Sequence, residues 1–339
     1  MKLFLVTLNA ICLLLASEVS QARHAEILID AENGNVLHET DSTQSWFPAS
    51  LTKMMTLYVT FDALANGEIH LTDTMHASHH AARQPQSRLG LHYDESITVE
   101  EAILALVTRS ANDASVVLSE HLAVTEDNFA IRMTAKAHSM GMYNSYFMNA
   151  TGLPNDWQVT TARDMALLAL KVQQTFPQYY HYFGAHSFHF KGRELFGINR
   201  FTATYEGAEG MKTGFTCNSG YNLVSSASQN GRHLIGVVLG GMTSNERYNF
   251  MIKQMDHGFD GDYNVITDNG FDGDYNVITD IGTMPTNSAG LPPHQLDCAS
   301  GAAHYIEPEV RHHIRHGHHH HLAKHTNSKA HPKAHHSRR

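Results

Sequence analysis

Cysteine is scarce in this sequence, with three residues in 339. Cys12 lies in the apolar stretch at the N-terminus, so only Cys217 and Cys298 remain for the body of the chain. That number excludes a small disulfide-rich scaffold, and the two cysteines could either pair in an oxidising compartment or stay free. No arrangement of Cys and His in the body has the spacing of a zinc site, so we predict neither a metal site there nor a cofactor.

Long apolar runs are also missing. No segment after residue 22 approaches the roughly 18 uninterrupted apolar residues of a membrane-spanning helix. At the N-terminus, Lys2 precedes an interrupted apolar run, and Ser20-Gln21-Ala22 places small residues at the −3 and −1 positions of a cleavage site. We predict a signal peptide over residues 1–22, and hence an exported protein of the periplasm or cell envelope with no transmembrane segment after its removal. An uncleaved anchor is the alternative.

Basic residues are few, except at the C-terminal end. The chain has 24 Lys and Arg against 33 Asp and Glu, a formal net charge of −9. Seven of the basic residues lie in residues 311–339, where there is no acidic residue, so the rest of the chain is still more acidic. An acidic body argues against a nucleic-acid partner.

The same C-terminal segment holds 11 of the 27 histidines, which continue from His312 to His336 and do not fit an expression tag. Three interpretations stay open for it. It binds metal through neutral imidazoles, it is a pH-dependent tether to anionic envelope polymers, or it is a solvated tail. We predict a linker and a disordered tail over residues 283–339.

A tandem duplication precedes this tail, because residues 258–268 recur as residues 270–280. Asp260, Asp262 and Asn264 have the first spacings of a calcium loop, but Val265 stands where that loop needs Gly. We therefore interpret residues 259–282 as a 12-residue repeat in a tolerant surface segment.

Two hairpins are predicted at opposite ends of the body. Residues 25–39 read as strand, Asn33-Gly34 turn and strand, and residues 221–239 repeat the pattern around Asn230-Gly231. Asn-Gly favours tight hairpins because both central residues need positive φ. The middle of the chain has helical periodicity, from 48 to 65, from 98 to 107, and near 113–122, 126–139 and 161 onward. We predict one α+β domain over residues 23–258, with an antiparallel sheet from both chain ends packed against a helical cluster.

The sequence Ser50-Leu51-Thr52-Lys53 opens the first of these helices. Residues at i and i+3 share a helix face, so the Lys53 ammonium should lie beside the Ser50 hydroxyl. A serine needs a base to become a nucleophile, and a desolvated lysine near other cations loses its proton near neutral pH. The backbone N–H of Ser50, at a helix start, is available to an oxyanion.

Two further motifs follow in order. Ser110-Ala111-Asn112 lies between two helices, where Ser110 can relay a proton and Asn112 can hydrogen-bond a substrate amide. Lys212-Thr213-Gly214 precedes the second hairpin and should lie on a strand. Lys212 adds positive charge next to Lys53, and we expect Gly214 to leave room for a substrate along the strand.

Together the three motifs resemble those of the low-molecular-mass penicillin-binding proteins, the serine-type D-alanyl-D-alanine carboxypeptidases, whose fold is that of β-lactamases and transpeptidases. The similarity extends to longer stretches: residues 47–56, 110–114, 161–166 and 210–216. It covers roughly residues 25–258.

The resemblance implies a reaction. Ser50 attacks the penultimate D-Ala carbonyl of a peptidoglycan stem peptide, forms an acyl-enzyme and releases the terminal D-Ala. Lys53 is the base, and Ser110 and Lys212 help to move the proton. Penicillins imitate D-Ala-D-Ala and acylate Ser50 as well.

The resemblance also implies substrate-binding residues. Asn112 binds the peptide, Thr213 binds the terminal carboxylate, and the N–H groups of Ser50 and Phe215 form the oxyanion hole. Gly214 joins this group as a cleft residue.

Two departures from the family pattern stand out. Residues 259–339 show neither a second β-rich domain nor an amphipathic anchor helix, and Met242 stands where some relatives have a basic residue, a place that Arg247 could fill. Three alternatives remain: a β-lactamase, for which we find no Glu-x-x-Leu-Asn segment, a D,D-endopeptidase on the same site, and a catalytically idle envelope-binding protein.

Overall fold

The computed structural model describes residues 24–261 and 279–284, together with residue 286, residues 291–293 and the strands β10 (Leu296–Asp297) and β11 (His304–Tyr305). These residues belong to one compact unit, Met1–Ile306. The second unit, Glu307–Arg339, contains none of the described residues. The predicted signal peptide, residues 262–278 of the repeat and the His-rich tail also lie outside the described residues and stay predictions.

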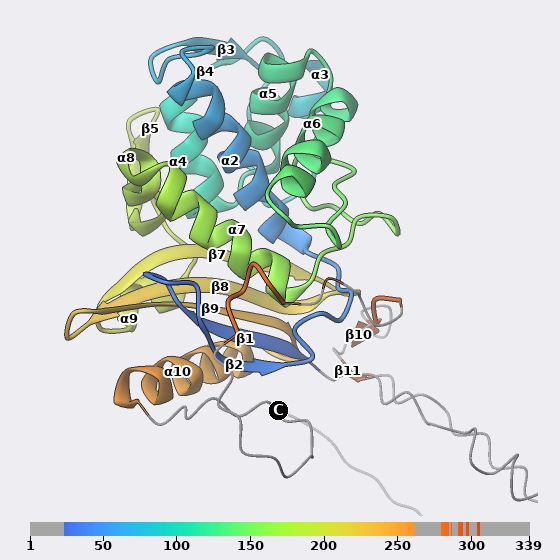
Figure 1. The fold of residues 1–339 in the computed structure, drawn as a ribbon. Coiled ribbons are helices and arrows are strands. Elements are labelled where there is room, and N and C mark those ends of the chain that lie inside the picture. Colours follow the sequence, from blue (N-terminus) through green and yellow to red (C-terminus); the bar gives the residue numbers. More distant parts are fainter. Residues whose placement is uncertain are drawn as a thin grey trace, which may run out of the picture. The chain divides into compact units, whose positions relative to one another are not determined.

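A five-stranded antiparallel sheet forms the centre of the fold, in the order β2-β1-β9-β8-β7 (Figure 1). Its strands are β1 (Ala25–Asp30), β2 (Val36–Thr40), β7 (Ala208–Thr216), β8 (Gly220–Gln229) and β9 (Arg232–Gly241). β1 pairs with β9 over its whole length, with Leu28 opposite Gly236. The two ends of the domain therefore meet in one sheet, which confirms the predicted arrangement.

Both predicted hairpins form around their Asn-Gly pairs, but only the second has positive φ at both residues, because the first turn is longer and needs it at Gly34 and not at Asn33. Gly34 has a φ of 78°, and Asn230 and Gly231 have φ values of 52° and 77°. These left-handed conformations suit Gly and Asn far better than branched residues, which is why these pairs mark the turns.

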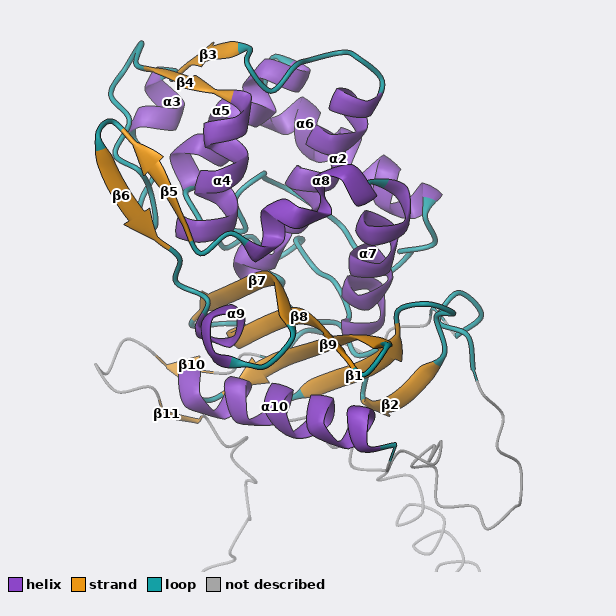
Figure 2. Ribbon diagram, turned by 90° about the vertical axis from the view of Figure 1, so that its left-hand side faces the viewer, coloured by secondary structure: helices purple, strands orange, loops and turns teal. Residues whose placement is uncertain are grey.

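Helices cover both faces of the sheet (Figures 1 and 2). One face carries η1 (Ala49–Leu51), α2 (Thr52–Ala65), α3 (His79–Ala82), α4 (Val99–Arg109), α5 (Asn112–Ala123), α6 (Glu126–Ser139), α7 (Ala162–Thr175), α8 (Pro177–Tyr180) and η2 (His181–Gly184). The other face carries α9 (Arg200–Thr204) and α10 (Ser244–Asp260). Two small hairpins flank the helices: β3 (Thr74–His76) with β4 (Ser96–Thr98), and β5 (Ser187–Phe190) with β6 (Arg193–Phe196). None of the described helices is both long enough and apolar enough to cross a membrane.

The helix starts follow the capping signals of the sequence. Thr98 and Glu101 form a capping box at the start of α4, and Thr161 accepts the Asp164 N–H at the start of α7. The predicted helix over residues 48–65 begins with the single turn η1 and continues as α2, whose residues are buried on all sides. Burial all round matches its lack of a polar face.

Strand alternation supplies two apolar cores. Ile27 and Ile29 of β1 face the helical cluster, whereas Leu28 between them packs with Met251 and Met255 of α10. Successive side chains of a strand point to opposite faces, so one strand contributes to both cores. The sheet is consequently the middle one of three layers.

Two predicted boundaries need correction. The domain does not end at residue 258, because α10 continues to Asp260 and ends at Gly261 in a left-handed conformation. Residues at the end of the repeat segment and directly after it also return to the body: Ile281 and Met284 are buried in the core, and Ile281 donates its N–H to the Gly34 carbonyl at 2.9 Å. The start of the predicted linker, at residue 283, therefore falls inside a packed segment, because the apolar side chains of Ile281 and Met284 on either side of it are buried in the core.

Candidate active site

The three sequence motifs meet at one cleft between the helical cluster and β7. Its volume is about 330 Å³, and its walls come from the start of the buried helix, the α4–α5 junction, the edge strand and a loop after α6. The lining residues include Ser50, Ser110, Asn112, Thr213, Gly214 and Phe215. Lys53 and Lys212 lie behind them, almost fully buried. The structure thus brings all eight predicted site residues together.

Ser50 lies in η1, one turn before Lys53 in α2. The Lys53 Nζ is 3.2 Å from the Ser50 Oγ, as the i, i+3 spacing predicted. Nζ also donates to the Asn112 Oδ1 at 2.8 Å and to the Thr151 carbonyl. The amine therefore has two carbonyl acceptors besides the hydroxyl.

The protonation of Lys53 is set by its surroundings. Burial lowers the pKa of Lys53 well below its usual value, and the charge of Lys212 lowers that pKa further. The carboxylates of Glu126 and Asp113 act in the opposite direction and raise it. The balance favours a neutral amine, which is the form that accepts a proton.

Ser110 and Lys212 form a second pair. Ser110 ends α4 in a left-handed conformation, with a φ of 54°, which turns its side chain into the cleft. The Lys212 Nζ donates to the Ser110 Oγ at 3.0 Å and to the Thr213 carbonyl at 2.8 Å. Burial, with a smaller contribution from Arg247, lowers the pKa of Lys212 to about 7.

Non-glycine residues in strained conformations occur at or beside each motif. Ala49, directly before Ser50, has a φ of 49°, and Met211, directly before Lys212, has a φ of 129°. Together with Ser110, they place one residue with positive φ in each of the three motif regions. Such conformations cost about 1–3 kcal/mol each and persist where surrounding packing enforces them.

Asn112 connects the cleft to the loop before β4. Its Oδ1 accepts from Lys53, its Nδ2 donates to the Pro85 carbonyl at 3.0 Å, and its backbone N–H donates to the Ser87 carbonyl at 2.7 Å. Gln86 and Ser87 line the cleft. The side chain expected to bind a substrate amide therefore also positions Lys53 and the loop.

The expected role of Gly214 needs correction. A Cβ at Gly214 would lie 3.0 Å from the Pro48 carbonyl oxygen and 3.2 Å from the N atoms of Ser50 and Leu51. The missing side chain therefore lets β7 approach the start of the helix, and the room it leaves is filled by backbone. The consequence is that the Ser50 N–H lies beside the strand that carries Phe215.

Sequence reasoning did not identify the segment 149–152. The Thr151 carbonyl accepts from Lys53, and a Cβ at Gly152 would lie 1.9 Å from the Ala49 carbonyl oxygen. The Asn149 Oδ1 accepts the N–H groups of Thr151 and Gly152 in a side-chain turn. The Asn-Ala-Thr-Gly sequence signals such a turn, but only the fold shows that it contacts Lys53.

Arg247 is the residue that we considered as a replacement for the basic residue missing at position 242. It lines the cleft, and its Nη1 donates to the carbonyls of Gly214 and Asn222, both at 3.2 Å. The guanidinium also lies 5.5 Å from the centre of the Tyr221 ring. It supplies fixed positive charge at the β7 end of the cleft.

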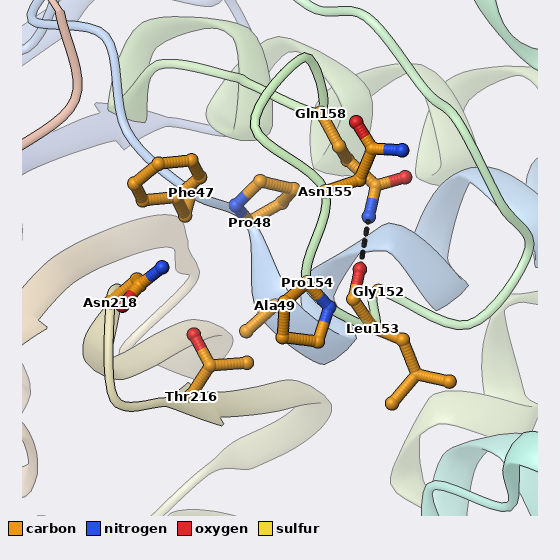
Figure 3. A pocket seen from close by; sticks show the side chains of 10 residues that line it. All are labelled: Phe47, Pro48, Ala49, Gly152, Leu153, Pro154, Asn155, Gln158, Thr216 and Asn218. Carbon is orange, nitrogen blue, oxygen red and sulfur yellow. Dashed lines mark hydrogen bonds between the residues drawn. The ribbon is translucent and has the colours of Figure 1, made fainter. Parts of the chain in front are cut away.

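A much smaller hollow adjoins the cleft and shares Gly152, Leu153 and Thr216 with it. Figure 3 shows the residues that line it and the hydrogen bond of 3.2 Å from the Gln158 side chain to the Leu153 carbonyl; the lining residues are 47–49, 152–155, Gln158, Thr216 and Asn218. Its volume of about 10 Å³ is the size of one water molecule. The cleft with Ser50 is therefore the place for a substrate.

From the sequence alone, Cys217 and Cys298 could either pair or stay free, and no metal site is predicted in the body of the chain. Cys217 is disulfide-bonded, and Cys298 lies outside the described residues. Within the described part of the chain, no group of three or more His, Cys, Asp or Glu side chains could hold a metal ion.

Comparisons with known proteins agree on one family. A family model described as D-alanyl-D-alanine carboxypeptidase, Peptidase S11, matches residues 15–243. The carboxypeptidase DacF of Bacillus subtilis is 32% identical over 248 residues, which are 72% of this chain and 64% of that protein. DacC of Escherichia coli is 35% identical over 242 residues, 69% of this chain and 60% of that protein. The chain therefore spans somewhat less than two thirds of the length of these curated relatives.

Solved structures show the same fold. Penicillin-binding protein 5 of Haemophilus influenzae matches with a TM-score of 0.67 and 33% identity, over 70% of each chain. Penicillin-binding protein D2 of Listeria monocytogenes, in an ampicillin-bound form, matches with a TM-score of 0.64 and 29% identity, over 69% of this chain and 96% of that one. The cleft motifs, the fold and the match over residues 15–243 lead to the same conclusion, and the chain belongs to the D-alanyl-D-alanine carboxypeptidase family.

Proposed function

We propose that the chain is a serine D-Ala-D-Ala carboxypeptidase that removes the terminal D-Ala from peptidoglycan stem peptides and is inhibited by penicillins. The observation that carries the proposal is the convergence of two hydrogen-bonded pairs, Ser50 with Lys53 and Ser110 with Lys212, on one cleft. The names of the relatives and the ampicillin-bound neighbour support the substrate class.

The hydrogen bonds of Lys53 support its role as the base. A neutral amine has two N–H groups and one lone pair. The Asn112 Oδ1 and the Thr151 carbonyl accept the two N–H groups, so the lone pair is left to face the Ser50 hydroxyl. Lys53 then takes the Ser50 proton as the Oγ–carbon bond to the substrate carbonyl forms.

The rest of the reaction follows from the positions of the other groups. The negative oxygen of the tetrahedral intermediate is stabilised by the N–H groups of Ser50 and Phe215. The bond to D-Ala breaks, and the leaving nitrogen receives the proton that Lys53 took from Ser50, passed on through Ser110, which Lys212 holds in place. Lys53 is then neutral again. A water attacks the acyl group and gives one proton to Lys53, which returns it to the Ser50 oxygen as the acyl bond breaks.

The substrate carboxylate should lie near Thr213 and Lys212, with Arg247 adding positive charge at the β7 end of the cleft.

Export through the predicted signal peptide would place the enzyme where stem peptides are. N-terminal sequencing of secreted protein tests the export, with Ala22 expected as the last residue removed.

Labelled penicillin tests the proposal directly. Mass spectrometry should find the adduct on the peptide that contains Ser50, and D-Ala should be released from a pentapeptide by the same preparation. Ser50→Ala should abolish both. Ser139→Ala is the matched control, because among the described residues the hydroxyl of this exposed serine has one hydrogen bond, to the Lys136 carbonyl. An adduct that persists in Ser50→Ala contradicts the assignment.

A further inference from the structure

Lys53 works as a base only if its two N–H groups point at fixed acceptors. One acceptor, the Thr151 carbonyl, belongs to the backbone of the segment 149–152, which no catalytic motif contains. What holds this segment therefore also determines where the lone pair of Lys53 points.

The backbone of Ala150, one residue earlier, is fixed at both of its polar groups. Its carbonyl accepts from the hydroxyls of Thr56, at 2.8 Å, and Ser115, at 2.5 Å. Its N–H donates to the Oε1 of Glu126 at 2.9 Å. Glu126 is thus a side-chain carboxylate that contacts the segment from a different element, the first turn of α6.

We propose that Glu126 is a positioning residue for the acylation reaction, because its carboxylate fixes the Ala150 amide and thereby the Thr151 carbonyl that orients Lys53. The inference rests on the proposed function of the cleft. The second carboxylate oxygen of Glu126, Oε2, lies 2.7 Å from the Nε2 of His80 on α3, and only 13% of the Glu126 side chain is exposed. The carboxylate therefore cannot rotate away without losing two partners.

The negative charge of Glu126 has a second effect on the same amine. Burial and Lys212 lower the pKa of Lys53, whereas Glu126 on α6 and Asp113 on α5 raise it. A general base is most effective when its pKa lies near the working pH. Glu126 thus supports the basicity of Lys53 as well as its orientation.

Two substitutions separate these effects. Glu126→Gln keeps an oxygen for the Ala150 N–H but removes the charge. The pKa of Lys53 should then fall, so the rise of the penicillin acylation rate with pH should move to lower pH, while the plateau rate stays within about threefold of the unchanged protein. Glu126→Ala removes the acceptor too, and the plateau rate should fall about tenfold or more, as expected when a catalytic group loses its alignment.

Glu120 offers matched controls. It accepts from the Ser78 hydroxyl, just before α3, at 2.9 Å, much as Glu126 contacts His80, but it has no hydrogen bond to the segment 149–152 among the described residues. Glu120→Gln and Glu120→Ala should leave both the plateau rate and the pH profile unchanged. His80→Gln removes the imidazole that contacts Glu126, and the shift caused by Glu126→Gln should persist in that background.

The outcomes are distinguishable from a failure of the proposed function, because the unchanged protein must first form its adduct on Ser50. Given that adduct, a Glu126→Ala plateau rate within threefold of the unchanged protein overturns the inference. If Glu126→Ala does not fold, as judged by thermal melting, Glu126→Asp takes its place, because its shorter side chain keeps the charge but withdraws the carboxylate from the Ala150 N–H. A Glu126→Asp plateau rate within threefold of the unchanged protein then overturns the inference as well.

Discussion

Gly152→Ala is the substitution for which the structure makes the sharpest prediction. The new Cβ would lie 1.9 Å from the carbonyl oxygen of Ala49 and 2.3 Å from its carbon, both backbone atoms directly before Ser50. The residue also has a φ of 84°, where alanine costs about 1–2 kcal/mol. Moving the overlapping backbone adds about 1–3 kcal/mol, so the free energy of unfolding should fall by about 2–5 kcal/mol.

Activity should fall more than stability alone explains. Relief of the overlap must displace either Thr151 and its carbonyl or Ala49 and the adjacent Ser50. A shift near 1 Å at a reacting group costs on the order of 10²-fold in rate. The assay is the rate of adduct formation with labelled penicillin, measured well below the melting temperature of the variant.

Gly67→Ala is the matched control. Gly67 has a φ of 71°, close to that of Gly152, but a Cβ there would meet nothing within 4 Å. It should lose about 1–2 kcal/mol of stability and acylate normally. If Gly152→Ala also acylates within threefold of the unchanged protein, the contact between residues 49 and 152 does not position the nucleophile, and the reasoning is refuted.

Three further predictions follow from the buried groups and from the packed C-terminal segment. Lys212→Met should abolish D-Ala release, and its melting temperature relative to that of the unchanged protein should be higher at pH 6 than at pH 9. The reason is that a buried lysine with a pKa of about 7 destabilises the fold when it is protonated, and this destabilisation lessens as the pH rises. A pH-independent difference in melting temperature would contradict this. D-Ala release from a pentapeptide should exceed penicillin turnover by about 10² or more, because the opened β-lactam keeps its leaving group tethered and obstructs the water that Lys53 would activate, and no dedicated second base is visible by motif to compensate; equal rates would indicate a β-lactamase. Two truncated chains should be compared in reducing buffer, because Cys217 is disulfide-bonded. A chain that ends after Met284 should keep peptide turnover within about threefold, whereas a chain that ends at residue 278 lacks the buried Ile281 and should lose about 2–5 kcal/mol of stability. Equal melting temperatures of the two chains would place Ile281 outside the core.

Local signals in the sequence were sufficient for most of the fold. The Asn-Gly turns and the capping residues Thr98 and Thr161 mark elements whose ends depend on their own residues. The helix α10 was missed although Thr243 and Glu246 carry a start signal, and the Thr243 hydroxyl does accept the Glu246 N–H at 3.0 Å. Its polar composition next to a repeat concealed the stripe that packs on the sheet.

The site was predictable in its side chains and not in its backbone. Ser50, Lys53, Ser110 and Lys212 lie in motifs whose spacing is visible along the chain. The Thr151 carbonyl, the Glu126 contact and the close approach at Gly214 depend on segments that meet only in the folded protein. No residue type marks a backbone carbonyl as an acceptor, so such partners are found only in three dimensions.

The position of β1 in the sheet has a consequence for how the molecule folds. This N-terminal strand pairs on one side with its neighbour β2 and on the other with β9, some two hundred residues later. Contacts between such distant segments make folding slow, because a long loop must close before they form. During synthesis the sheet cannot be completed until Gly241 has emerged, and the edge of β1 that β9 covers stays open until then. The export that we propose would therefore act on a chain whose sheet is still incomplete.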